Sequence, residues 1–349
     1  MKKQTIFMIA LGFILMIAGG VGSLFYYQQL ETQRQNNDVH EKFKYDNSEE
    51  LEITIKNGAS LHLSTSDDDY VHMNKQGVSY NKNDKNSASW TVEKSGKKTF
   101  VTIDNKSSVT QNGPNFFNFG NIYDDNISLS FPSNYKKIVV KGKNLDVNAY
   151  DLTLTNLSVE SGSGSIYASG LVSDELSIES KHGDIRLQEG KIAKDVAITS
   201  TNGNVSVEDT SFTNLKAKLT NGDIVTGNTR GDINITNQSG YTSVNHQRGQ
   251  TDIESTNGDI MFHGNDVNHD VALQTVHGDI QFEIDEDSYD NNKFDLSTQY
   301  GIVSIFNKNL SSDTTYKSNK GKSTIKASSK NGDISVDQID DDDTEYHDY

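Results

Sequence analysis

The sequence predicts an all-β protein, built as a flattened parallel β-solenoid of short two-strand rungs with about 18 to 20 residues per turn. Three observations predict this fold. A glycine recurs at a regular spacing, aliphatic residues alternate with polar ones on both sides of it, and no stretch after the first 27 residues keeps a 3.6-residue hydrophobic period. Because only 33% of the 349 residues are hydrophobic, the core of such a coil must be thin.

The chain begins with a segment typical of a membrane anchor. Two lysines precede an uncharged run over residues 5–27, and about 23 helical residues span roughly 34 Å, more than the ~30 Å of a hydrocarbon core. We therefore expect residues 1–27 to be a cytoplasmic stub and a transmembrane helix. The rest of the chain would then be extracellular. A cleaved signal peptide is the alternative, with Gly20 and Gly22 as a weak cleavage site.

Four further regions follow in order. Residues 28–48 are polar and predict a tether. Residues 49–336 are expected to form the extracytoplasmic solenoid, with a β-rich lead-in over 49–141 and the repeats over 142–336. Residues 337–349 are expected to form an acidic, solvated tail. Alternation predicts strands in the lead-in at residues 51–55, 61–63, 90–92, 100–103, 127–131 and 138–140.

The repeats carry the pattern Asn or His, Gly, Asp, Ile. A tight turn between strands requires positive φ at successive positions, which Asn and Gly adopt most readily and which His also tolerates. After Gly278 the spacing becomes irregular, which predicts an insertion or a closing cap. We assign a structural turn role to Gly183, Gly203, Gly222, Gly240, Gly258, Gly278 and Gly332.

The aspartates that follow these glycines have two interpretations. They accept hydrogen bonds from turn amides, or they bind calcium, as in nonapeptide rolls of the same pitch. Those rolls need a doubled glycine, which these repeats lack, and one position is Asn204, so the turn role is favoured. With no cysteine and no HExxH pair of histidines, we expect no metal site and no cofactor.

Charge and composition restrict the function. A net charge of -17 disfavours nucleic acid as a partner, because phosphate contacts need clustered Lys and Arg. A glycan-active β-helix enzyme remains an alternative, but it would need paired carboxylates in a groove and aromatic platforms for the sugar. The chain has one tryptophan, and its acidic residues are evenly scattered. We expect no catalytic residues and no enzyme activity.

One non-repetitive segment contains Phe116, Phe117, Phe119 and Tyr123 in a Gly/Asn-rich context. These aromatic residues are candidates for a binding patch that contacts a partner or the bilayer. The other interpretation is that they cover an open end of the coil, which a solenoid must protect.

The anchor, the lead-in run Ile127-Ser128-Leu129-Ser130-Phe131-Pro132 and the Ser/Thr-x-Asn-Gly-Asp-Ile units occur together in order. In this combination the chain resembles the bacterial putative-adhesin family of membrane-anchored β-solenoids, which includes LiaG-like proteins. The resemblance implies a non-catalytic extracytoplasmic domain with an envelope-associated interaction or stress-response role. A protein or a cell-envelope glycan is the expected partner, besides the membrane. An adhesin for external ligands is the other binding alternative.

Overall fold

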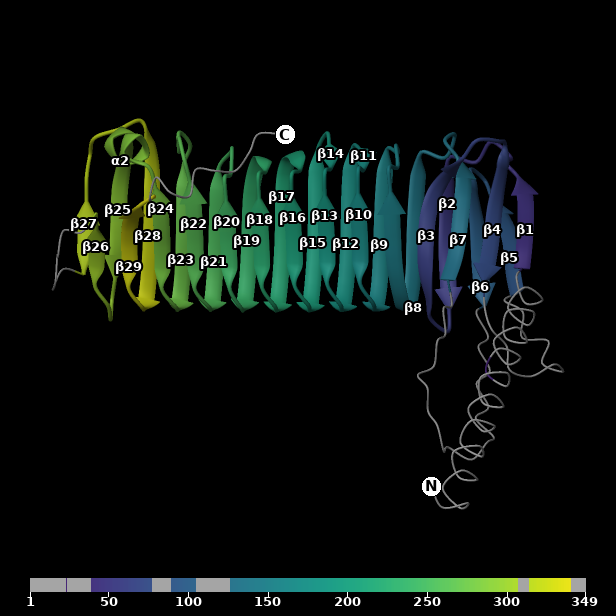
Figure 1. Cartoon of the computed structure of the whole chain (residues 1–349), viewed down its shortest axis with the longest axis horizontal. Helices are drawn as coiled ribbons and strands as arrows, with labels where there is room; N and C mark the ends of the chain where they lie inside the picture. The colour runs from purple at the N-terminus through teal and green to yellow at the C-terminus, as the bar shows by residue number, and fades with distance from the viewer. Residues whose placement is uncertain (1–22, 24–38, 77–88, 105–125, 307–313, 340–349) are drawn as a thin grey trace, which may run out of the picture.

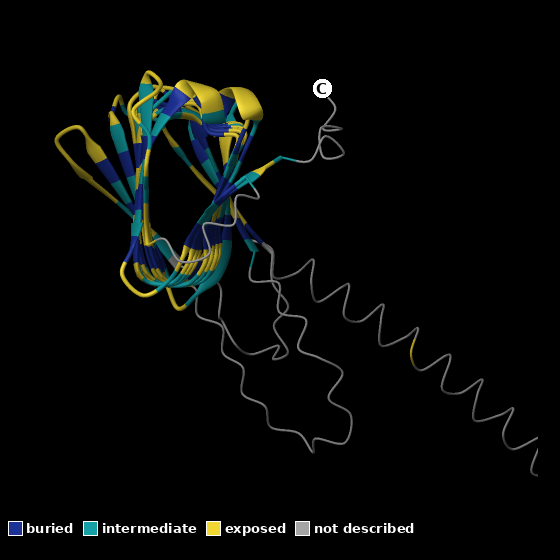
Figure 2. Ribbon diagram, turned by 90° about the vertical axis from the view of Figure 1, so that its left-hand side faces the viewer, coloured by how far each residue is buried: buried dark blue, intermediate teal, exposed yellow. Residues whose placement is uncertain are grey.

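A computed structural model describes residues 23, 39–76, 89–104, 126–306 and 314–339. Within these ranges nearly every element is a β-strand, which confirms the all-β prediction. The strands stack side by side into a long rod (Figure 1). Seen along the rod, the ribbon forms two facing walls in which buried and exposed residues alternate (Figure 2).

We call one wall sheet 1. In spatial order it contains β5 (Ser89–Ser95), β6 (Lys98–Asp104), β2 (Glu50–Lys56), the first half of β8 (Lys137–Tyr150), β9 (Asn156–Ser163), β12 (Glu175–His182), β15 (Asp195–Asn202), β17 (Ser211–Asn221), β19 (Arg230–Ser239), β21 (Thr251–Asn257), β23 (Val271–His277), β28 (Ser323–Asn331), β25 (Asn292–Thr298) and β27 (Thr315–Lys317).

The opposite wall is sheet 2. It contains β1 (Val39–Lys44), β4 (Tyr70–Gln76), β7 (Asn126–Pro132), β3 (Ala59–Ser66), the second half of β8, β10 (Ile166–Ser169), β13 (Ile185–Gln188), β16 (Val205–Glu208), β18 (Ile224–Gly227), β20 (Thr242–Asn245), β22 (Ile260–Gly264), β24 (Ile280–Ile284), β29 (Ile334–Gln338) and β26 (Val303–Ile305). A rung is one sheet 1 strand and the sheet 2 strand that follows it.

Neighbouring rungs pair in parallel and in register. Ile178 of β12 lies opposite Val159 of β9 and Ile198 of β15, and all three side chains are buried. Because strand residues alternate between faces, each inward position continues as an aliphatic column along the rod. Burial of one such side chain contributes about 1.5–3 kcal/mol, so many thin rungs together supply the core.

A third, shorter ladder closes each rung along one edge. We call it the edge ladder. It includes β11 (Val172–Ser173) and β14 (Lys191–Ile192), and it runs in parallel through Val172, Lys191, Ser211, Arg230 and Arg248. The predicted rung has only two strands. Pieces of one or two residues carry no alternation, so the sequence pattern did not indicate this ladder.

The order of the rungs in space differs from their order in the chain at both ends. The β28/β29 rung lies between the β23/β24 rung and the β25/β26 rung. At the other end, β2 and β3 lie between β8 and the β6/β7 pair. The irregular spacing after Gly278 therefore reflects an exchanged order. The end rung β25/β26 comes earlier in the sequence than the β28/β29 rung on which it stacks.

Aromatic clusters cover both ends of the core. At the β25 end, Tyr289 contacts Phe294 and Phe306, with ring centroids 5.3 and 4.3 Å apart. At the β1 end, the rings of Phe43 and Trp90 lie 5.7 Å apart. Antiparallel β27 and β1 flank these clusters. A solenoid needs such caps because its last rung has no neighbour.

The predicted localisation is corrected. In the part of the chain that the structure describes, no helix is long and apolar enough to span a membrane. The helix α2 (Glu286–Asn291) has six residues, about 9 Å at 1.5 Å per residue, and begins with acidic side chains. The anchor prediction of a single-pass protein with an extracellular C-terminal domain rested on residues 5–27, of which only Ser23 is described.

The structure also places a strand in the segment that composition predicts as a tether. β1 lies within residues 28–48 and pairs antiparallel with β4, where Phe43 faces Val71. Phe43 packs against the core. Its apolar side chain thus gains a partner that is distant in sequence, which a reading of local polarity does not detect.

Candidate interaction surface

The turn that leads from sheet 1 to sheet 2 runs along the edge opposite the edge ladder. The seven assigned turn glycines have φ of +127° (Gly183), +144° (Gly203), +143° (Gly222), +132° (Gly240), +157° (Gly258), +150° (Gly278) and +158° (Gly332). A Cβ on Gly258 would lie 2.0 Å from the carbonyl oxygen of Gly240. Glycine is therefore required both by the backbone conformation and by the close approach of the neighbouring rung. The prediction of positive φ at the preceding position is wrong: Asn202, Asn221 and His277 do not have it, and Asn202 and Asn221 end strands of sheet 1 instead.

The aspartates of these turns bind the backbone of the neighbouring rung. Asp184 Oδ1 accepts a hydrogen bond from the Asn204 N–H at 2.8 Å, and Asn204 Oδ1 accepts one from the Asp223 N–H at 2.9 Å. Asp279 accepts in the same way from the Asp333 N–H at 2.7 Å. Asn204 makes the contact without a carboxylate, so the turn uses an acceptor oxygen rather than a charge.

No cation is needed to explain these aspartates. Across the described ranges, no group of three or more His, Cys, Asp or Glu side chains is placed to hold a metal ion. The hydrogen bonds between rungs engage one oxygen, Oδ1, of the Asp184 and Asp279 carboxylates. These contacts give the turn aspartates a structural role.

A second polar ladder lies inside the coil, three residues before the turn glycines. Asn237 Nδ2 donates to the carbonyl oxygens of Gly222 and Gly240 at 3.1 and 3.2 Å, and Ser329 Oγ donates to that of Gly278 at 2.9 Å. Leu219 takes this position before Gly222, and the buried polar side chains there are Ser161, Ser180, Ser200, Asn237, Ser255, Thr275, Thr298 and Ser329. The Ser/Thr of the repeat unit is visible in the sequence, but its role in satisfying turn carbonyls depends on the stacked rungs.

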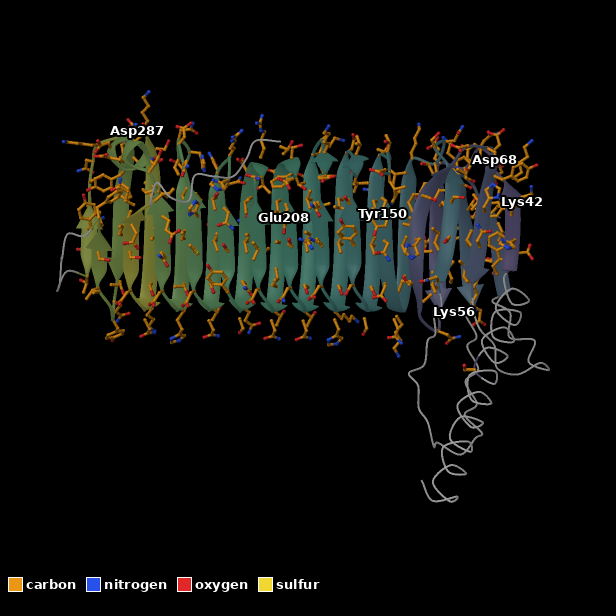
Figure 3. All side chains as sticks on the ribbon, in the orientation of Figure 1. Lys42, Lys56, Asp68, Tyr150, Glu208 and Asp287 are labelled. Atoms are coloured by element: carbon orange, nitrogen blue, oxygen red, sulfur yellow. The ribbon has the colours of Figure 1, made fainter. Side chains whose placement is uncertain are left out.

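The outward side of sheet 2 carries exposed tyrosines, and we call it the tyrosine face. It extends from β8 to β22 and is defined by Tyr150, Tyr167, Val225, Tyr241 and Met261. The rings of Tyr150 and Tyr167 lie 5.4 Å apart. Tyr241 Oη lies 2.9 Å from Met261 Sδ, and partial burial raises the pKa of Tyr241, which keeps its phenol neutral. Tyr150 and Glu208 mark positions along the middle of the rod (Figure 3).

Exposed large hydrophobic side chains are concentrated away from sheet 1. Tyr150 is 46% exposed, Tyr241 37% and Val225 36%, all on the tyrosine face. The other described examples are Val172 on the edge ladder and Tyr300 and Ile302 in the turn of the end rung. Of the described residues, none of this class lies on the outward side of sheet 1, so the two outer faces differ in chemistry.

Polar side chains fill the space between the tyrosines. Tyr167 Oη donates to Gln188 Oε1 at 3.3 Å, and Arg186 pairs with Glu208 at 3.3 Å. Further along the face, His263 Nδ1 lies 2.9 Å from Glu283 Oε2. The acidic groups here are engaged by neighbours on adjacent rungs rather than held as an isolated carboxylate pair.

The binding residues predicted from sequence, Phe116, Phe117, Phe119 and Tyr123, lie outside the described residues, so their role stays a prediction. The tyrosine face was not predicted. Its members lie on different rungs and become neighbours only because the rungs stack in register, so no local motif connects them.

Comparison with known proteins gives a family match over most of the chain. The family described as Toastrack DUF4097 matches residues 48–247 and 229–337. No curated protein matches the chain.

Several solved structures are similar in architecture. A putative adhesin from Bacteroides fragilis has 17% identity and a TM-score of 0.42, over 86% of this chain and 97% of that one. A putative cell adhesion protein from Clostridium sporogenes has 10% identity and a TM-score of 0.27, over 86% and 100%. A putative lipid binding protein from Parabacteroides distasonis has 13% identity and a TM-score of 0.34, over 87% and 97%. At such low values these likenesses carry no functional argument.

The two family matches together include the lead-in strands, the repeats with their turn glycines and the end rung. The resemblance inferred from the sequence is thereby confirmed, and the chain belongs to the Toastrack DUF4097 family.

Proposed function

We propose that this protein is a non-catalytic interaction protein that binds an extended glycan along the tyrosine face. The observation that carries the proposal is the placement of exposed tyrosines on one outer face of the rod while the opposite face has none in the described ranges. Tyrosine offers an apolar ring and a hydroxyl in one rigid side chain. That combination suits a ligand made of rings with polar edges.

The dimensions of the face suit a polymer rather than a small molecule. Tyr167 on β10 and Tyr241 beside β20 are four rungs apart, which corresponds to roughly 19 Å at ~4.8 Å per rung. Between them lie side chains with free hydrogen-bonding capacity, such as Arg186 and Gln188. A strip of this length can contact several linked sugar rings at once, so the free energies of modest contacts would add up along the glycan.

The chemistry of the face supports binding without catalysis. Hydrolysis of a glycan needs two carboxyl groups that flank the scissile bond. Glu208 is engaged by Arg186 and Ser206, and Glu283 by His263 and Gln281. Each acid is thus held by neighbours on a flat surface.

The experiment is a binding screen of the folded protein against immobilised glycans, followed by calorimetry with the best ligand. The set should contain polymers of bacterial envelopes and polymers of external surfaces, which separates the envelope-partner prediction from the adhesin prediction. Tyr150→Ala and Tyr241→Ala should each weaken binding roughly three- to tenfold through lost stacking. Lys218→Ala on the outward side of sheet 1 is the matched control and should bind normally.

Two outcomes would contradict the proposal. One is that no glycan binds. The other is that the tyrosine variants and the Lys218→Ala control bind equally well. The stress-response role implied by the family resemblance stays a prediction, because a binding measurement does not address it.

A further inference from the structure

A hollow of about 350 Å³ lies on the edge ladder and includes Lys191 of β14 in its lining. The label of β14 marks this edge at the top of the rod in Figure 1. We call it the edge groove. Its walls come from three consecutive rungs, with Glu189, Lys191, Asp209, Ser211 and Arg230 among the lining residues. Lys191, Ser211 and Arg230 are register partners on the ladder. The small Ser211 between two long basic side chains leaves the middle of the groove open.

The edge groove coincides with a break in the regularity of the coil. Lys191 and Ser211 pair on the ladder while Asp195 pairs with Asn214 on sheet 1, so the connection shortens by one residue between these rungs. A further register shift occurs between Ser211 and Asn214 where β17 meets β19. Irregularities of this kind re-aim side chains and are common beside functional sites.

The charges around the groove are balanced but not paired with each other. Glu189 and Asp209 occupy corner positions with φ of 55° and 49°, and Lys191 and Arg230 line the same hollow. No ion pair within 4.0 Å joins any of these four side chains to another described residue, whereas nearby Arg186 pairs with Glu208 at 3.3 Å. Asp151 and His246 have φ of 50° at the same corner of other rungs, so this conformation belongs to the coil, and the hollow is distinguished by its mixed-charge lining.

The register of the edge ladder adds a second indication. Arg230 and Arg248 are partners in a parallel backbone β-bridge, so two residues of like charge lie in register on adjacent rungs. Like charges in this arrangement destabilise a sheet. A bound acidic group would relieve the repulsion. A simple anion, however, would also be repelled by Glu189 and Asp209, which line the same groove.

We propose that the edge groove binds a zwitterionic group, in which an ammonium and a carboxylate or phosphate are separated by a few bonds. The ammonium would lie against Glu189 and Asp209, and the acidic end against Lys191 and Arg230. Charge-assisted hydrogen bonds of this type are shorter and stronger than neutral ones. Such a group occurs at the free ends of short peptides and in phosphoethanolamine headgroups.

The test is calorimetric titration of the folded protein with four probes. They are alanyl-alanine, its N-acetylated form, its C-terminal amide and O-phosphoethanolamine. The first and last probes carry both charges and should bind, and each blocked dipeptide should bind about tenfold more weakly or worse, because one charged contact is lost. Preference for alanyl-alanine identifies a peptide source, and preference for O-phosphoethanolamine identifies a lipid headgroup.

Variants locate the site. Glu189→Gln and Lys191→Gln should each reduce affinity for the zwitterionic probe by about tenfold or more, with unchanged melting curves because both side chains are exposed. Ser211→Tyr should block the groove. Lys218→Gln removes an exposed lysine from the outward side of sheet 1 and should bind as the wild type does.

The proposal is overturned if neither zwitterionic probe binds, if the blocked dipeptides bind equally well, or if the groove variants bind like the Lys218→Gln control. The inference goes beyond the proposed glycan binding. Tyr150→Ala should leave the dipeptide titration unchanged, so the two proposals can fail separately.

Discussion

The carboxylate of Asp184 accepts a hydrogen bond from the backbone N–H of Asn204 at 2.8 Å, and the two residues occupy the same turn position on successive rungs. The side chain of one repeat therefore satisfies the backbone of the next. This relationship gives a physical reason for the recurrence of Asp or Asn after most of the turn glycines: the side-chain oxygen accepts from the backbone of the next rung. Tyr241, which follows Gly240, is an exception.

Gly258→Val should destabilise the protein by at least about 2 kcal/mol, since it combines a strained backbone with a collision. The added Cβ would meet the Gly240 carbonyl oxygen at 2.0 Å. Gly227→Val is the matched control, because a Cβ there has only Glu208 Cγ nearby, at 3.9 Å. Urea denaturation compares the two variants, and equal unfolding midpoints would refute the assignment of Gly258 to the turn.

Asp223→Asn should be almost neutral, whereas Asp223→Ala should cost about 1 kcal/mol, the net value of one hydrogen bond. The amide oxygen of Asn can still accept from the Tyr241 N–H, which lies 2.8 Å from Asp223 Oδ1. Addition of calcium should leave the melting temperature of the wild type unchanged. A calcium-dependent rise that the Asn variant loses would instead support the cation interpretation of these aspartates.

The free energy of unfolding should decrease as the pH falls below neutrality, and His269 is one cause. Its Nε2 is buried without a hydrogen-bond partner in the described structure. Burial lowers the pKa of His269, against the opposing effect of Asp232, Asp270 and Asp266. As pH drops below the unfolded value of about 6.5, the unfolded chain takes up the proton first, so the free energy of unfolding decreases.

His269→Gln should make the free energy of unfolding decrease less between about pH 7 and pH 5, as measured by urea denaturation. His40→Gln, at an exposed histidine, should show the same decrease as the wild type. Identical pH profiles for the two variants would exclude His269 as the origin.

Asn331 should deamidate faster than the other Asn-Gly pairs of the repeats. After Asn202, Asn221 and Asn257, the glycine N–H donates to the next rung at 3.1, 3.0 and 2.8 Å. In the described structure the Gly332 N–H has no such acceptor. Its nitrogen is thus freer to attack the Asn331 side-chain carbonyl carbon, which releases ammonia and forms a succinimide that water opens to Asp or isoaspartate.

Peptide mass spectrometry during incubation at mildly alkaline pH measures all four sites in one sample, so the three bonded sites serve as internal controls. Equal rates at the four sites would show that the hydrogen bond to the next rung gives no protection. In that case the local Asn-Gly sequence alone would set the rate.

The local sequence pattern was sufficient to predict the parts of the fold that depend on residues adjacent in the chain. Alternation located the strand around Ile53 and those of the repeats, and the Asn-Gly pairs located the turns, although only the glycine of each pair has positive φ. The same approach missed Phe43 in β1 and the two-residue strands of the edge ladder. Their partners are distant in sequence, and their own segments are too short to show a period.

The candidate surfaces could not be predicted for a related reason. Tyr150, Tyr167 and Tyr241 share one face, and Glu189 and Arg230 share one hollow, only after the rungs stack. Each residue alone resembles an ordinary exposed position. Register between rungs, set by aliphatic columns and turn hydrogen bonds, brings them together.

The turns and the inward-facing positions follow from the sequence, because glycine conformation and side-chain alternation are properties of the local chain. The order of the rungs, in contrast, depends on contacts between distant segments. Ile325 of β28 stacks between Val271 of β23 and Phe294 of β25, although β25 comes first in the chain. Inward aliphatic positions of different rungs are nearly interchangeable, so the alternation pattern is compatible with more than one order, and the order is decided by long-range pairing and by the aromatic end cap.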